Sequence, residues 1–112
     1  MAYREIESIE RLEMLEERLG ISLNGVSAEI GDFDDDMECV LVVRGEVVSL
    51  DGGGLEDGFY LKMSAFNSRG KCVGVADTYF SGDRFFGIDI FELKTFVRDD
   101  DVQKIRVIAT KF

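Results

Sequence analysis

Hydrophobic and polar residues alternate with a period of two along most of the chain after residue 20. The clearest case is the segment FYLKMSAFNSRGKCVGVADTYF, where the runs Phe59–Phe66 and Lys71–Phe80 flank a short polar turn at residues 67–70. A period of two places successive side chains on opposite faces of a strand, so this segment predicts a β-hairpin. Because a tight turn joins antiparallel neighbours, the prediction extends to an antiparallel β-domain.

Several further segments have β character and are separated by glycine-rich or acidic turns. Turns about every ten residues are typical of a small β-sandwich, and no helix long enough for a crossover follows residue 20. The sequence therefore predicts a mainly β fold, a small antiparallel sandwich. Its other expected strands are Val26–Ile30, Met37–Leu50, Phe85–Val97 and Val102–Phe112.

The N-terminal segment shows a different period. Apolar residues recur at intervals of three or four, with acidic and basic residues between them, and Gly20 follows the last of them. This spacing predicts one N-terminal amphipathic helix over residues 3–19, ended by the glycine. Its apolar stripe needs a partner surface, either the sheet of its own chain or a second copy. We expect one domain over residues 1–112, with the sandwich at 21–112. The stripe consists of Ile6, Ile9, Leu12, Leu15 and Leu19.

The C-terminal two thirds, about residues 37–112, contain an ordered set of short motifs. The run VRGEVV at 43–48 precedes the hairpin FNSRGKCVG at 66–74, and FELK follows at 91–94. This order resembles the FxLYD type of small immunoglobulin-like β-sandwich. That family usually has a Pro-Gly pair before the late strand, whereas this chain has no proline. The resemblance implies an immunoglobulin-like interaction or accessory module without catalytic residues.

The composition narrows the range of partners. The chain has 13 basic and 23 acidic residues, a net charge of −10, which disfavours binding to DNA, RNA or anionic membranes. A basic protein surface or a cation is the better expectation. The absence of histidine excludes Ser-His-Asp and Cys-His nucleophiles and His-ligated zinc. No apolar stretch approaches the roughly 20 residues of a transmembrane helix.

The two cysteines, Cys39 and Cys72, both fall in predicted strands. The N-terminal residues are acidic and lack the pattern of a secretory signal, so a cytoplasmic setting with reduced thiols is the default expectation. A disulfide between the two strands is the alternative.

Acidic clusters in the predicted loops suggest a second kind of site. Carboxylates in loops are ligands that calcium prefers, and the spacing at 32–36 imitates the start of an EF-hand. However, Met37 stands where that loop needs glycine, and Val43 stands where it needs glutamate. A calcium site of another type remains an alternative to simple turn capping and strand-edge protection. Its candidate ligands are Asp32, Asp34, Asp36, Asp99 and Asp101.

An aromatic pair in a predicted loop is the remaining candidate. Phe85 and Phe86 follow Arg84, and we expect this piece to be exposed as a contact site. With the stripe residues Ile9, Leu12, Leu15 and Leu19, it gives the favoured function: a non-enzymatic module that acts through protein–protein contacts, with another protein or as a homodimer. Two alternatives stay open. One is a calcium- or small-ligand-binding sandwich, and the other is an acidic inhibitor that masks a basic partner.

Overall fold

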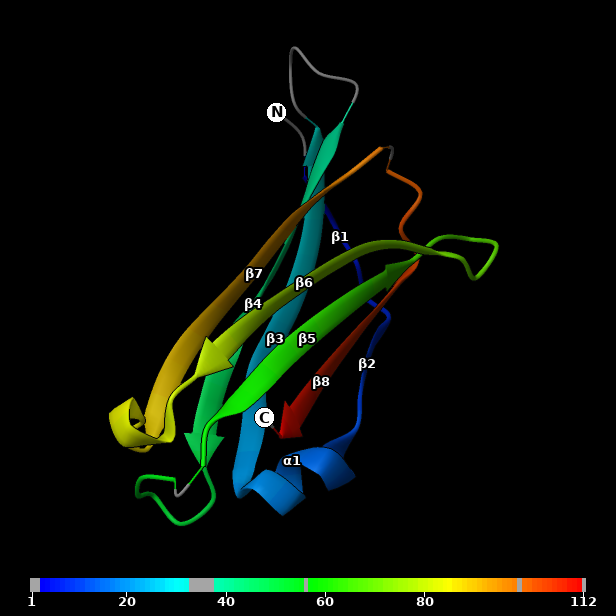
Figure 1. The fold of residues 1–112 in the computed structure, drawn as a ribbon. Helices are drawn as coiled ribbons and strands as arrows, with labels where there is room; N and C mark the ends of the chain where they lie inside the picture. Colours follow the sequence, from blue (N-terminus) through cyan, green and yellow to red (C-terminus); the bar gives the residue numbers. More distant parts are fainter. Residues whose placement is uncertain (1–2, 33–37, 56, 99, 112) are drawn as a thin grey trace.

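The computed structural model describes residues 3–32, 38–55, 57–98 and 100–111, and the fold is mainly β (Figure 1). One α-helix and one short 3₁₀ helix accompany the strands in the described residues. In chain order the elements are β1 (Tyr3–Glu5), β2 (Ile9–Arg11), α1 (Glu13–Leu19), β3 (Ile21–Asp32), β4 (Cys39–Ser49), β5 (Phe59–Phe66), β6 (Cys72–Phe80), η1 (Gly82–Arg84), β7 (Ile88–Val97) and β8 (Lys104–Lys111).

The strands form two four-stranded sheets. Sheet A has the order β1-β3-β4-β7, and sheet B has the order β2-β8-β5-β6. The chain changes sheet between β1 and β2, between β2 and β3, between β4 and β5, and on each side of β7. Among the described pairs only β2 and β8 run parallel, so the antiparallel prediction holds for the long strands.

One hydrophobic core lies between the sheets. Alternate residues of β5, from Phe59 to Ala65, are buried, as the period of two predicts. The matching positions of β4 and β7 face them from sheet A. The largest fully buried apolar side chains include Phe59, Leu61, Met63, Leu41, Leu23, Leu93 and Ile105.

Each sheet has a central long strand with a neighbour on either side. Strand β4 lies between β3 and β7 in sheet A, and β5 lies between β6 and β8 in sheet B. The mainly β prediction is therefore confirmed.

The prediction of one helix over residues 3–19 is wrong. Residues 3–5 form β1 on sheet A, residues 9–11 form β2 on sheet B, and the helix covers only 13–19. Ile6 lies between the two strands and is buried in the core, where its N–H donates to the carbonyl of Ala28 at 2.9 Å. The apolar residues at intervals of three therefore belong to a segment that passes from sheet A to sheet B. Strand pairing overrides the local helical pattern here.

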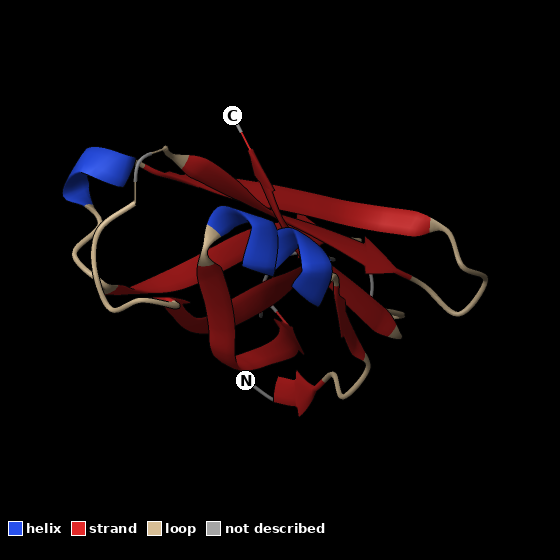
Figure 2. Ribbon diagram, turned by 90° about the horizontal axis from the view of Figure 1, so that it is seen from below, coloured by secondary structure: helices blue, strands red, loops and turns tan. Residues whose placement is uncertain are grey.

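Helix α1 spans the lower end of the two sheets and contacts β3 of sheet A and β8 of sheet B (Figure 2). Gly20 ends it with φ 76°, the left-handed conformation expected of the predicted C-terminal glycine. Glu16 is the buried polar anchor of the helix. Its carboxylate pairs with the Arg11 guanidinium at 3.1 Å and accepts the N–H of Leu23 at 3.2 Å.

The predicted hairpin is confirmed. Strand β5 has the predicted bounds and β6 begins one residue later than predicted. The side-chain oxygen of Asn67 accepts the N–H groups of Arg69 and Lys71 at 3.0 and 2.9 Å. An Asx turn of this kind explains why asparagine, and not an apolar residue, occupies the position.

Candidate functional site

Exposed apolar side chains gather at the end of sheet A where β4 finishes and β7 begins. Phe86 is 83% exposed, Ile90 74%, Leu50 59% and Ile88 58%. These four residues are called the apolar patch below. An apolar cluster on the outer face of a sheet is unusual for a strand surface that only contacts water, and it marks a contact surface.

The strand register holds the apolar patch together. Val48 pairs with Ile88, and the N–H of Ser49 donates to the carbonyl of Gly87 at 2.8 Å. Leu50 and Phe86 are the residues that follow this pair, just beyond the end of β4 and just before the start of β7. The N–H of Leu50 also donates to the carbonyl of Gly20 at 2.8 Å, which ties the patch to the end of α1.

The structure separates the two phenylalanines that the sequence analysis took together. Phe85 has extended backbone angles of −95° and 116°, so Phe85 and Phe86 point to opposite sides. Phe85 is only 2% exposed and meets the ring of Phe59 edge-on at 6.3 Å. The expectation of an exposed Phe85 is therefore wrong. Arg84, the last residue of η1, is exposed.

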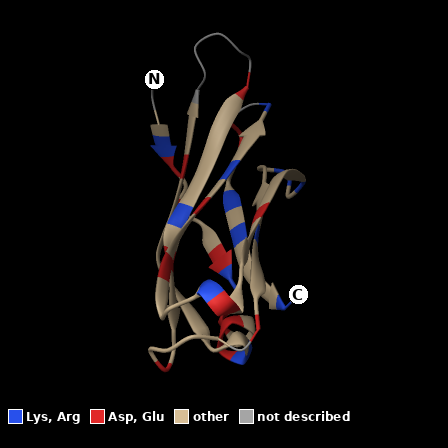
Figure 3. Cartoon of the chain, turned by 60° about the vertical axis from the view of Figure 1, so that its left-hand side comes forward, with Lys and Arg blue, Asp and Glu red and all other residues tan. Residues whose placement is uncertain are grey.

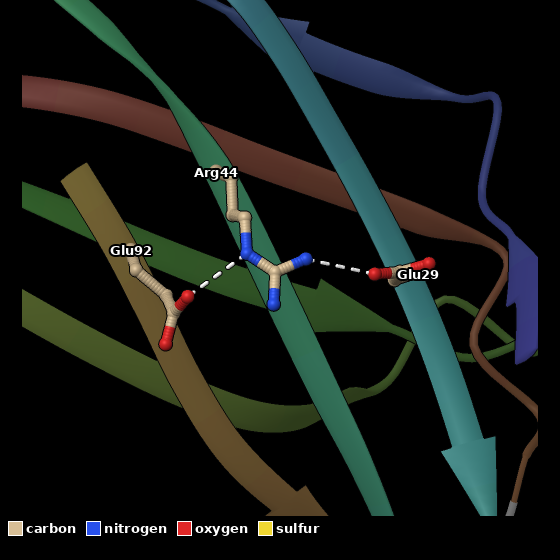
Figure 4. Close-up of polar contacts among 3 residues, drawn as sticks. All are labelled: Glu29, Arg44 and Glu92. Carbon is tan, nitrogen blue, oxygen red and sulfur yellow. Dashed lines mark hydrogen bonds and ion pairs between the residues drawn. The ribbon is translucent and has the colours of Figure 1, made fainter. Parts of the chain in front are cut away.

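An ion-pair triad lies on the outer face of sheet A, two residues along β4 and β7 from the pair of Glu46 and Ile90. Figure 4 shows its three side chains. Arg44 of β4 contacts Glu29 of β3 and Glu92 of β7, each at 2.8 Å. The hydrogen bonds that Arg44 donates to the carboxylates, that to Glu92 first and then that to Glu29, raise the pKa of Arg44. One guanidinium is shared by two carboxylates, so the triad as a whole keeps one negative charge.

One acidic residue lies beside the apolar patch on the same face, because Glu46 pairs in register with Ile90. Asp89 lies between the two outward isoleucines of β7 and therefore on the opposite side of that strand. The Asp51 carboxylate accepts hydrogen bonds from Ser49 and Gly53. All three acidic residues are exposed, and Figure 3 shows how acidic and basic residues are distributed over the chain. Glu46 and the net negative triad thus form the charged border of the patch.

The predicted helix stripe is divided between elements. Ile9 lies in β2 and Leu19 at the end of α1, both partly buried against the core of this chain. Leu15 and Leu19 line a surface pocket of 380 Å³ with Ala109 of β8. Leu12, at the start of the helix, is exposed. The stripe packs mainly on its own sheets.

Of the predicted calcium ligands, Asp34, Asp36 and Asp99 lie outside the described residues, and Asp32 ends β3. Asp101 is described and caps the hairpin. Its carboxylate accepts the hydroxyl of Ser68 at 2.8 Å and the amide of Gln103 at 3.2 Å. These hydrogen bonds, that of Ser68 first, lower the pKa of Asp101. Within the described part of the chain, no group of three acidic or cysteine side chains could hold a metal ion.

The outer face of sheet B has a different character. Lys104 and Arg106 of β8 lie over the ring of Phe66 at 5.0 and 5.2 Å, and both pair with Glu10 of β2. The hydrogen bond from Arg106 is the main cause that lowers the pKa of Glu10. The basic groups of this face are thus occupied by contacts within the chain. Cys72 is exposed on β6 of this sheet, whereas Cys39 is buried on β4 of sheet A.

Sequence reasoning missed Leu50, Ile88 and Ile90. The run Ile88-Asp89-Ile90-Phe91 is apolar at three of its four positions, and the alternation alone does not say which face is buried. Asp89, between the two isoleucines, was the available signal. It is exposed on the edge strand β7, and a charged residue there indicates that this part of the strand is not buried.

No protein-family model and no curated protein matches this sequence. In the described residues, no helix has the length and apolar character needed to cross a membrane.

Proposed function

We propose that this chain is a protein–protein interaction module whose contact surface is the apolar patch on sheet A. The observation that carries the proposal is the exposure of Phe86, Leu50 and Ile88 at the adjoining ends of β4 and β7. Aromatic side chains at the centre of an apolar area are typical anchors of protein interfaces. The non-enzymatic character and the cytoplasmic setting predicted from the sequence are parts of this proposal.

The chemistry of the border indicates the partner. Glu46 and the net negative triad of Arg44, Glu29 and Glu92 lie beside the apolar side chains, and the whole chain carries a net charge of −10. A complementary surface presents apolar residues with lysine or arginine at their edge. The resemblance of residues 66–74 to the FxLYD hairpin supports the same class of function, an immunoglobulin-like accessory module, and stays a prediction.

The test compares what three immobilised proteins retain from an extract of the source cells. They are the wild type, the double variant Leu50→Ser/Phe86→Ser, and the matched control Val73→Ser/Val75→Ser. The control removes two exposed valines from the outer face of β6 on sheet B. We expect partners that bind the wild type and the control at least about tenfold more strongly than the patch variant.

The charged residues beside the apolar patch predict that binding of a retained partner depends on the salt concentration. The association rate of a retained partner should fall as the salt concentration rises, because the border charges steer it. If the patch variant and the wild type retain the same proteins, the apolar patch is not the contact surface.

A further inference from the structure

Strand β7 ends sheet A, and no described strand is hydrogen-bonded to its second edge. Strand β6 of sheet B packs against β7 where Gly74 meets Thr95 and Val97. The N–H of Ser49 bonds to Gly87, and the register from there to Val97 runs without a shift. In an antiparallel ladder the bonding direction alternates, so odd-numbered residues of β7 bond β4 and even-numbered residues face outward. Among the described strands, none pairs with this outward edge.

The four sheet edges of the molecule differ in what they offer. The strands β1 and β2 have three residues each, and edges as short as these are protected against pairing. Strand β6 is long, but Asp77 is its single charged residue and has no opposite charge on that strand. Strand β7 has ten residues and carries both signs of charge on its outer face.

The charges of β7 are self-complementary. Glu92 and Lys94 stand two residues apart on the same face, and both direct their backbone groups to the open edge. Lys94 makes no ion pair with any described residue, while the triad of Arg44, Glu29 and Glu92 keeps one negative charge. The edge therefore presents an unbalanced negative charge next to a lysine.

We propose that two copies of this chain pair through their β7 strands, antiparallel, with Glu92 of each opposite Lys94 of the other. This register brings together residues whose N–H and C=O groups both face the edge, as a hydrogen-bonded pair requires. It places Ile90 opposite Phe96 of the second copy. A shift of this register by two residues in one direction would place Glu92 opposite Glu92 of the second copy. A shift by two residues in the other direction would place Lys94 opposite Lys94. The inference deepens the proposed function and rests on it, since it names a second copy as one partner of the module.

The pairing has one local cost and one consequence. The Asp89 carboxylate accepts the N–H of Ile90 at 2.9 Å, and that bond must be exchanged for one to the second copy. A twofold axis through the paired edge makes the two copies of sheet A continuous. Both apolar patches then lie on the same face of one eight-stranded sheet, which allows two-point contact with a partner.

The test is a charge exchange followed by sedimentation across a concentration series. Glu92→Lys places lysine opposite lysine, and Lys94→Glu places glutamate opposite glutamate, twice in each dimer. We expect each variant to weaken self-association about tenfold or more. An equimolar mixture of the two variants restores the opposite charges at every contact, so it should associate as strongly as the wild type. Thermal unfolding of each variant serves as the control for folding.

The outcomes separate this inference from the proposed function. A wild type that stays monomeric at its highest soluble concentration, or a mixture that fails to recover association, overturns the pairing. The variant Leu50→Ser/Phe86→Ser, which leaves the paired residues intact, should self-associate like the wild type. If that variant alone loses self-association while both charge variants keep it, the second copy docks on the apolar patch: the edge pairing is then wrong, and the proposed function stands.

Discussion

Phe85→Ala is expected to lower the free energy of unfolding by about 3–5 kcal/mol, the usual range for a buried phenylalanine in a core. Its ring fills the core end beside Phe59, which in turn stacks on Phe80 at 5.1 Å. The neighbouring substitution Phe86→Ala is expected to change stability by less than about 0.5 kcal/mol, because that side chain is exposed.

Urea denaturation of the two variants and the wild type measures both values. The pair is internally matched, since each variant removes the same ring from adjacent positions. Equal losses of stability in the two variants would contradict the assignment of Phe85 to the core and Phe86 to the contact surface.

Glu16→Ala is expected to cost about 2–4 kcal/mol of folding free energy. The substitution leaves the N–H of Leu23 without its acceptor and the Arg11 guanidinium without its counter-charge. Both groups lie under α1, where water replaces the lost contacts poorly. We expect a smaller loss of stability than for a fully buried ion pair, because the Arg11 side chain is 27% exposed.

Glu16→Gln is the matched control for this prediction. The amide oxygen can still accept the N–H of Leu23, so the control should lose less stability than the alanine variant. Thermal unfolding followed by circular dichroism checks the order. An alanine variant as stable as the wild type would show that Glu16 does not anchor the helix to β3.

The period of two predicted most of the strands because each has one face in the core. The hairpin of β5 and β6 is the best case, since alternating side chains and the Asn67 turn agree on one register. Strand β3 was predicted only as Val26–Ile30. Its first half contains polar residues on the outer face and a register shift between Asn24 and Ser27, which together hide the alternation.

Residues 3–11 could not be predicted locally. The pairing of β2 with β8 joins segments almost a full chain length apart, with Ile9 opposite Ile105. Contacts of that range leave no mark in a window of neighbouring residues. The division of Phe85 from Phe86 has the same origin, because Phe85 is buried by its contact with Phe59, which lies 26 positions earlier in the chain.

The pairing of two copies through β7 is tested most directly by amide hydrogen exchange of the wild type at low and high protein concentration. The account predicts that the outward amides of Glu92 and Lys94 exchange more slowly as concentration rises. The amides of Leu93 and Thr95, which already bond to β4, should keep their rates. Outward amides of β7 that exchange at the same rate at every concentration, while amides of β6 become protected, would contradict it.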